Sequence, residues 1–316
     1  MQGMTVENTI AAHPETVATI TVTFNPDLEL LQTQLNALPR ESFKIIVDNA
    51  SEPQSVQQLE SLVALTPNAQ LLRNTHNTGL AAALNLGVQR AREHAPSVRL
   101  ALLLDQDSEP LPGSVPALIA GFEELERMGR RVGCVGPTLI DVTTGLPHGF
   151  HQATHWRWRR VYPPPNSPPV SCTNLNGSGT VVSIELFLQL GGLDNQLFID
   201  HVDTAWSFRV LAAGYELWGI PSAVFRHRMG QSGLRFWFLG WRVWPARSPT
   251  RHYFLFRNAM VLMRRPEVLQ VWKFWAVIKL VLTAGVHGLF DRERGEQWRQ
   301  MWRGLHDGLR MPATRE

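Results

Sequence analysis

Hydrophobic and polar positions in the first half of the chain alternate between two periodicities. Short apolar runs predict strands at 17–24, 43–47, 70–72, 100–105 and 132–135. Between these runs, apolar residues recur at helical spacing and predict helices at 28–38, 56–65, 79–94 and 112–128. Strands that alternate with helices in this way are typical of βαβ units with parallel pairing. The pattern therefore predicts an α/β fold built on a parallel sheet.

The second half of the chain has a less regular pattern. Residues 136–173 lack a clear period and contain Pro163-Pro164-Pro165, so we expect an irregular loop or flap there. Regular elements resume afterwards, with strands predicted at 176–182 and 216–220 and helices at 183–190 and 202–210. This break predicts that the chain changes its organisation after the fifth strand.

Residues 268–290 form an apolar stretch that Lys273 and Lys279 interrupt. Its longest charge-free run, 280–290, is shorter than the ~20 residues that a helix uses to span a bilayer. Its tryptophans and lysines fit a helix that lies in a membrane interface, and a buried helix of a bundle is the alternative.

Charge is distributed unevenly along the chain. Residues 226–316 hold 17 Arg and Lys against 6 Asp and Glu, together with seven of the 11 Trp. This mixture fits either a nucleic-acid surface or an anionic membrane. The basic residues are scattered among apolar ones, and no nucleic-acid-binding motif is present, so we expect a membrane surface and no nucleic acid.

Two other features bear on location. Cys134 and Cys172 are too few for a disulfide framework and indicate a reducing compartment. Residues 1–16 contain no basic residue and no apolar run, so we expect a flexible leader rather than a secretory signal.

Polar side chains follow three of the predicted strands. Asn25 and Asp48 come after the first two strands, and Asp105-Gln106-Asp107 follows the fourth. Because the ends of parallel strands converge in a doubly wound sheet, we expect these residues to meet. Two carboxylates one residue apart can hold Mg²⁺ or Mn²⁺, which can carry a diphosphate. A turn or a helix cap is the alternative role for such residues.

Three further stretches carry candidate chemistry. Asn77-Thr78-Gly79 precedes a helix whose first N–H groups are expected to face an anion. Asp203 is expected in the first turn of a helix, with Asp200 near the cap, where a carboxylate acts either as a general base or as a cap. His227 lies between two arginines and either completes a metal site with Asp107 or belongs to a surface basic cluster.

Taken together, these stretches resemble the inverting glycosyltransferases of family 2, which have a GT-A fold, and in particular their rhamnosyltransferase branch. The resemblance rests on Asp105-Gln106-Asp107-Ser108 and Phe198-Ile199-Asp200-His201-Val202-Asp203, a combination typical of enzymes that use dTDP-L-rhamnose. Further matching stretches follow the family's order at residues 23–26, 47–49, 77–81, 85–87, 227–230, 257–258 and 307–308. Ala205 departs from the pattern, because the family usually has Glu at this position.

The resemblance implies a mixed, mostly parallel sheet flanked by helices, followed by a C-terminal helical extension that associates with a membrane. Residues 1–16 would be the leader and 17–230 the catalytic domain, divided into a nucleotide-sugar half (17–135) and an acceptor half (136–230). Residues 231–316 would form the basic, Trp-rich extension.

The resemblance also implies a role for each candidate residue. Asp203 would be the catalytic base, and Asp107 and His227 would hold Mg²⁺ or Mn²⁺. Asp200 and Trp206 would lie in the acceptor region. The donor would contact Asn25, Asp48, Asn77, Gly79, Asp105, Gln106 and Arg257.

The implied reaction moves L-rhamnose from dTDP-L-rhamnose to a hydroxyl of a lipid or glycolipid acceptor. We expect a mono-rhamnolipid as acceptor, giving a di-rhamnolipid, with assembly of O-antigen or another cell-surface polysaccharide as the alternative. A binding protein for nucleotide sugar or nucleic acid that lacks catalysis is a more remote alternative. The expected location is the cytoplasm, on the inner face of the cytoplasmic membrane.

Overall fold

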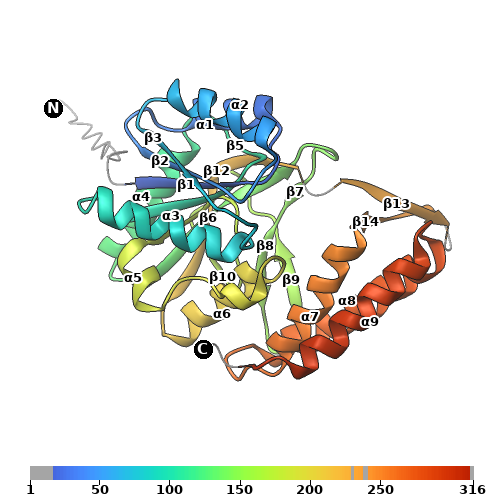
Figure 1. The fold of residues 1–316 in the computed structure, drawn as a ribbon. Helices are drawn as coiled ribbons and strands as arrows, with labels where there is room; N and C mark the ends of the chain where they lie inside the picture. Colours follow the sequence, from blue (N-terminus) through green and yellow to red (C-terminus); the bar gives the residue numbers. More distant parts are fainter. Residues whose placement is uncertain (1–16, 229–230, 238–240, 314–316) are drawn as a thin grey trace.

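A ten-stranded mixed sheet forms the centre of the protein, as seen in a computed structural model that describes residues 17–228, 231–237 and 241–313 (Figure 1). The main path runs β10-β12-β6-β11-β4-β1-β2-β3, while β5 pairs with β12 and β7 pairs with β6. The strands are β1 (Val17–Thr23), β2 (Phe43–Asp48), β3 (Ala69–Arg73), β4 (Leu100–Asp105), β5 (Ser108–Pro110), β6 (Val132–Asp141), β7 (Pro147–His148), β10 (Val170–Cys172), β11 (Thr180–Ser183) and β12 (Glu216–His227).

The longest pairings are parallel. They join β3 to β2, β2 to β1, β1 to β4, and β6 to β12. Strand β11 runs antiparallel to both β4 and β6. The sheet is therefore mixed and mostly parallel, as expected.

Helices cover both faces of this sheet. On one face lie α1 (Leu28–Ala37), α2 (Pro53–Ala64) and α4 (Ser114–Arg127), and on the other α3 (Leu80–His94), α5 (Ile184–Gln189) and α6 (Val202–Ala212) (Figure 1). Strand β4 supplies both cores, because Leu102 and Leu104 face the first group of helices, while Ala101 and Leu103 face the second. This double burial explains its unbroken apolar run.

The segment 136–173 is not the irregular loop that we expected. Strand β6 continues through Pro137 to Asp141, and short strands follow, namely β7, β8 (Phe150–Ala153), β9 (Trp158–Val161) and β10. β8 and β9 pair as an antiparallel hairpin. Strands of two to four residues are too short to show a sequence period, which is why the pattern failed to reveal them.

The C-terminal part forms a separate group of elements beside the sheet (Figure 1). A hairpin of β13 (Gln231–Trp237) and β14 (Trp241–Ala246) leads into α7 (Pro249–Met263), α8 (Gln270–Phe290) and α9 (Arg294–Arg310). The expected boundary between 230 and 231 falls at a gap in the described residues, and the expected leader lies wholly outside them.

Helix α8 has two different sides. By length and composition it could cross a membrane, the one such helix among the described residues. Trp272, Ala276 and Leu280 are buried against the rest of the protein, whereas Phe274 and Val281 are exposed. The exposed apolar side is the feature that distinguishes α8 from a buried helix of a bundle.

Candidate active site

A cleft of about 1280 Å³ opens between the sheet and the C-terminal helices. The strand ends and the loops that follow them form one side, and α7 and α8 form the other. Nine of the twelve candidate residues line it, namely Asn77, Gly79, Asp105, Gln106, Asp107, Asp200, Asp203, Trp206 and His227. Asn25, Asp48 and Arg257 are described but are not among its lining residues.

The ends of β1, β2 and β4 converge as expected, because β1 lies between the other two in the sheet. The side chain of Gln106 accepts a hydrogen bond from the backbone N–H of Phe24 at 2.8 Å. At the next strand end, Thr23 donates to the buried carboxylate of Asp48 at 3.1 Å. Asn25 accepts at 2.8 Å from the backbone N–H of Glu52. These contacts hold the three strand ends together, and the roles of Asn25, Asp48 and Gln106 toward a donor stay predictions.

Asp105, Asp107 and His227 form a group that fits a divalent cation. One possible ligand atom from each residue lies within 4.8 Å of the others. His227 Nδ1 lies 3.4 Å from Asp107 Oδ1 and 2.8 Å from the hydroxyl of Ser108, and Nε2 lies 3.9 Å from Asp105 Oδ2. Burial and the neighbouring Asp105 raise the pKa of Asp107, although His227 opposes this shift. Two carboxylates and an imidazole form a donor set that suits Mn²⁺, and the carboxylates suit Mg²⁺ as well.

Buried residues fix the loop that carries this group. Gln34, which is fully buried on α1, donates at 2.6 Å to the carbonyls of both Asp105 and Ser108. The hydroxyl of Ser178 accepts from the backbone N–H of Asp105 at 3.1 Å and also contacts the hydroxyl of Ser108. The loop is therefore held from two sides by side chains that carry no charge.

The N-terminus of α3 differs from our expectation. The backbone N–H groups of Leu80 and Ala81 donate to the carbonyl of Phe198, at 2.7 and 3.4 Å, so an anion cannot occupy that position. Asn77 accepts from the N–H of Gly79 at 3.0 Å. Gly79 has a φ of +86°, and a Cβ there would lie 2.5 Å from the ring of Phe198. Both the backbone conformation and the close packing against Phe198 therefore require glycine at position 79.

Asp203 lies in the first turn of α6, as predicted, and faces the same cleft. One carboxylate oxygen accepts from the backbone N–H of Thr204 at 2.8 Å. Burial raises the pKa of Asp203, an effect that hydrogen bonds from the backbones of Thr204 and Gly177 partly oppose. A carboxylate with a raised pKa at a cleft wall is suited to accept a proton from a substrate.

The loop before α6 has an unusual backbone. Phe198, Asp200 and His201 all have a φ between 61° and 63°, which is a costly conformation for residues other than glycine. The side-chain amide of Asn258 on α7 donates to the carbonyls of Leu197, Ile199 and Asp200, at 2.8, 2.7 and 2.8 Å. These bonds hold the strained loop in place.

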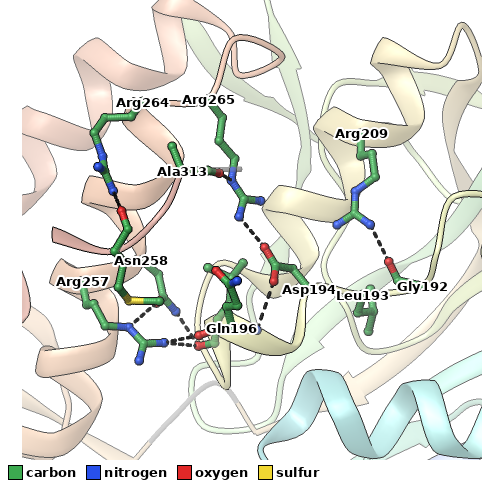
Figure 2. Close-up of polar contacts among 12 residues, drawn as sticks. Gly192, Leu193, Asp194, Gln196, Arg209, Arg257, Asn258, Arg264, Arg265 and Ala313 are labelled. Atoms are coloured by element: carbon green, nitrogen blue, oxygen red, sulfur yellow. Dashed lines mark hydrogen bonds and ion pairs between the residues drawn. The ribbon is translucent and has the colours of Figure 1, made fainter. Parts of the chain in front are cut away.

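Arg257, next to Asn258, supports the same loop. Its guanidinium donates to the carbonyls of Gln196 and Leu197, at 2.7 and 2.9 Å, and Figure 2 shows Arg257 and Asn258 directed toward this turn. Burial lowers the pKa of Arg257. Its role toward the donor stays a prediction, because these contacts engage it with the backbone.

Two arginines hold Asp200 from the side of the C-terminal extension. Arg247 lies 2.6 Å and Arg251 2.7 Å from its carboxylate oxygens. Burial alone would raise the pKa of Asp200, but the hydrogen bond and the charge of Arg251, with the charge of Arg247, lower it. Trp206, the other residue expected near an acceptor, is almost fully buried and donates to Cys134 Sγ at 3.2 Å.

Several residues of this site were missed in the sequence. Gln34, Ser178, Arg247, Arg251 and Asn258 contact residues that are 47 to 74 positions away along the chain. No local pattern identifies such contacts. Asn258 was noted only as part of a matching Arg-Asn pair.

Comparison with known proteins agrees with this geometry. Residues 20–163 match the family model described as Glycosyl transferase family 2. The protein is similar to dTDP-rhamnosyl transferase RfbF of Shigella flexneri, with 27% identity over 251 residues that cover 79% of this chain and 80% of that protein.

Solved structures share the fold at low sequence identity. GalNAc-T7 with UDP, GalNAc and Mn²⁺ has a TM-score of 0.56 at 17% identity, over 87% of this chain and 58% of that one. S. aureus TarS 1-349 with UDP-GlcNAc has a TM-score of 0.53 at 15% identity, over 90% and 78%. The mannosyltransferase PcManGT from Pyrobaculum calidifontis, with GDP-Man and Mn²⁺, also has a TM-score of 0.53, at 16% identity, over 95% and 88%. Residues 20–163 are therefore similar to glycosyltransferase family 2, and the chain has the fold of the GT-A glycosyltransferases.

Proposed function

We propose that this glycosyltransferase moves L-rhamnose from dTDP-L-rhamnose to a hydroxyl of a lipid-linked acceptor, with inversion at the anomeric carbon. The observation that carries the proposal is the placement of Asp203 and the Asp105–Asp107–His227 group on the walls of one cleft. The similarity to a dTDP-rhamnosyl transferase supports the choice of donor.

Different residues of the cleft have different roles in this reaction. Asp105, Asp107 and His227 would hold Mg²⁺ or Mn²⁺, which when bound stabilises negative charge on the diphosphate leaving group. The carboxylate of Asp203 accepts the proton of the acceptor hydroxyl as its oxygen attacks the anomeric carbon. A direct attack opposite the leaving group inverts that centre. The arginine-bound Asp200 keeps the start of α6 in place and stays ionised.

The acceptor in this proposal is a mono-rhamnolipid. Support comes from the far wall of the cleft, where Trp272, Ala276 and Leu280 of α8 present apolar surface. The outer side of α8 and α9 also exposes large apolar residues, among them Phe274, Val281 and Trp302. An anionic membrane on the cytoplasmic side would bind such a basic, apolar surface and supply a lipid-like acceptor.

The test is a transfer assay with purified protein, dTDP-L-rhamnose, Mn²⁺ and mono-rhamnolipid, with mass spectrometry of the lipid product. The proposal predicts a gain of one rhamnose, no gain with UDP-glucose, and no gain with the Asp203→Asn variant. A parallel reaction with a rhamnosylated polyprenyl diphosphate separates the two acceptor classes. Transfer only to the polyprenyl acceptor would show that the acceptor is a polysaccharide precursor and not a rhamnolipid. Transfer from UDP-glucose but not from dTDP-L-rhamnose would refute the choice of donor.

A further inference from the structure

One end of the cleft is rich in positive charge. Arg160 on β9, Arg247 before α7 and Lys279 on α8 all line this end. Arg247 is paired with Asp200. The side chain of Lys279, which is exposed, makes no hydrogen bond or ion pair with any residue that the structure describes. The exposed guanidinium of Arg160 donates to the ring of His151 at 3.1 Å. Two cations therefore face the cleft without a carboxylate partner among the described residues.

The positive charge at this end of the cleft lowers the pKa of neighbouring side chains. Burial, followed by the charges of Arg160 and Lys279, lowers the pKa of His148 to about 4. Burial and the charge of Arg160 lower the pKa of His151 to about 3. Burial also lowers the pKa of Lys279, and the charges of Arg247 and Arg160 lower it further. The histidines are thus neutral at pH 7 and add nothing to the charge of this end.

Lys279 and Arg160, neither of which pairs with a carboxylate among the described residues, lie on two walls of the cleft that aromatic rings connect. His151, the partner of Arg160, stacks on Trp158 with ring centroids 5.5 Å apart. Phe208 bridges the two walls, since its ring centroid lies 6.1 Å from that of Trp158 and 5.9 Å from that of Trp272 on α8. The cationic end of the cleft is therefore continuous with the apolar wall of α8.

Lys279 lies near the proposed base. Lys279 is close enough to Asp200 and Asp203 for their charges to raise its pKa against the effect of burial. A molecule whose hydroxyl reaches Asp203 thus places its neighbouring groups near Lys279. Apolar groups of the same molecule would lie along Trp272, Ala276 and Leu280.

We propose that Lys279 and Arg160 bind the anionic group of an amphiphilic acceptor, whose apolar part lies on α8 while its hydroxyl faces Asp203. This inference rests on the proposed function and deepens it, because it names the acceptor class as an anionic amphiphile. A carboxylate and a phosphate share the chemistry that two such cations recognise. Neutral glycolipids would bind less tightly, since they leave both cations without a partner.

The first experiment measures binding without any transfer reaction. The probes are dodecanoate and neutral dodecyl β-glucoside, titrated below their micelle concentrations into the full chain by calorimetry. We expect the wild-type protein to prefer dodecanoate, and Lys279→Met and Arg160→Gln each to weaken dodecanoate binding about tenfold while leaving the glucoside unchanged. Arg159→Gln is the matched control, because Arg159 is also on β9 but does not line the cleft.

The second experiment identifies the source of the anion. Mono-rhamnolipid as free acid, its methyl ester and a rhamnosylated polyprenyl diphosphate are compared as acceptors. If the wild-type protein prefers the free acid to the methyl ester as acceptor, and Lys279→Met abolishes that preference, the anionic group is a carboxylate. If Lys279→Met lowers activity only with the polyprenyl diphosphate acceptor, the anionic group is a phosphate. If the protein binds dodecanoate as predicted but uses none of these acceptors, the anion site is supported and the proposed function is refuted.

Two results would overturn the anion site itself. One is equal binding of dodecanoate and the glucoside, or a preference that both variants retain. The other is weaker binding of dTDP-L-rhamnose to Lys279→Met with unchanged dodecanoate binding, which would assign the lysine to the diphosphate of the donor.

Discussion

Removal of the Asn258 side chain should separate binding of the donor from catalysis. Asn258→Ala deletes three hydrogen bonds to the carbonyls of residues 197, 199 and 200, and also the one that its Oδ1 accepts from Arg257 at 2.9 Å. Loss of its partner costs a buried carbonyl about 1–3 kcal/mol, and Leu197 keeps the bond from Arg257. The other two carbonyls give an expected loss of about 2–6 kcal/mol in free energy of unfolding. Relaxation of the strained loop would also displace Asp203, and an error of about 1 Å costs about 100-fold in rate.

Two measurements on the same protein test this prediction. Urea unfolding reports the loss of stability, and steady-state kinetics with dTDP-L-rhamnose report kcat and the donor KM. We expect kcat to fall about 100-fold while the donor KM stays within about twofold, because the donor side of the cleft is untouched. Tyr253→Phe is a matched control on the same helix, since it removes the 3.0 Å bond to Asp307 on α9 and leaves the amide of Asn258 in place. A stability loss with wild-type kcat would refute the positioning argument.

Three further variants test other parts of the site. Asp203→Asn should lower kcat about 10²–10⁴-fold with unchanged donor affinity by calorimetry. Because the pKa of Asp203 is raised in the folded state, its ionisation costs stability, so the same variant should have a higher melting temperature at pH 7. That gain should vanish below about pH 4, where the unfolded chain is also protonated, and a gain that persists there would contradict the assignment. Asp107→Asn should weaken Mn²⁺ binding more than about tenfold in calorimetry without donor, and unchanged affinity would remove this residue from the metal group. Gln34→Leu should cost about 2–6 kcal/mol in urea unfolding, because it leaves two carbonyls, those of Asp105 and Ser108, without their amide donor. A neutral result would contradict that role.

The parallel half of the fold could be predicted from the sequence because β1, β2 and β4 are buried on both faces. Leu100 to Leu104 illustrates this, since five apolar residues in a row are typical of a strand that is buried on both faces. The expected strand at 216–220 was too short, because β12 continues past Pro221 to His227. Register shifts in its pairing with β6 place that proline where the ladder is already irregular.

The candidate site was predictable only where its residues belong to one stretch. Asp105, Asp107 and Asp203 follow a strand or begin a helix, so their positions could be predicted from local pattern. The residues that hold these side chains in place could not be predicted, because Gln34 and Asn258 donate hydrogen bonds to backbone carbonyls that are far away in the chain. The prediction that the start of α3 binds an anion was wrong for a similar reason, since its first N–H groups donate to the carbonyl of Phe198, which is distant in the chain.

Titration calorimetry with dTDP-L-rhamnose and UDP-glucose, each with Mn²⁺ and with EDTA, tests the central claim most directly. The proposed function predicts binding of dTDP-L-rhamnose in the presence of Mn²⁺, little binding in EDTA, and no comparable binding of UDP-glucose. Binding of neither sugar nucleotide to folded protein, or equal binding with and without the metal, would contradict the roles assigned to Asp105, Asp107 and His227.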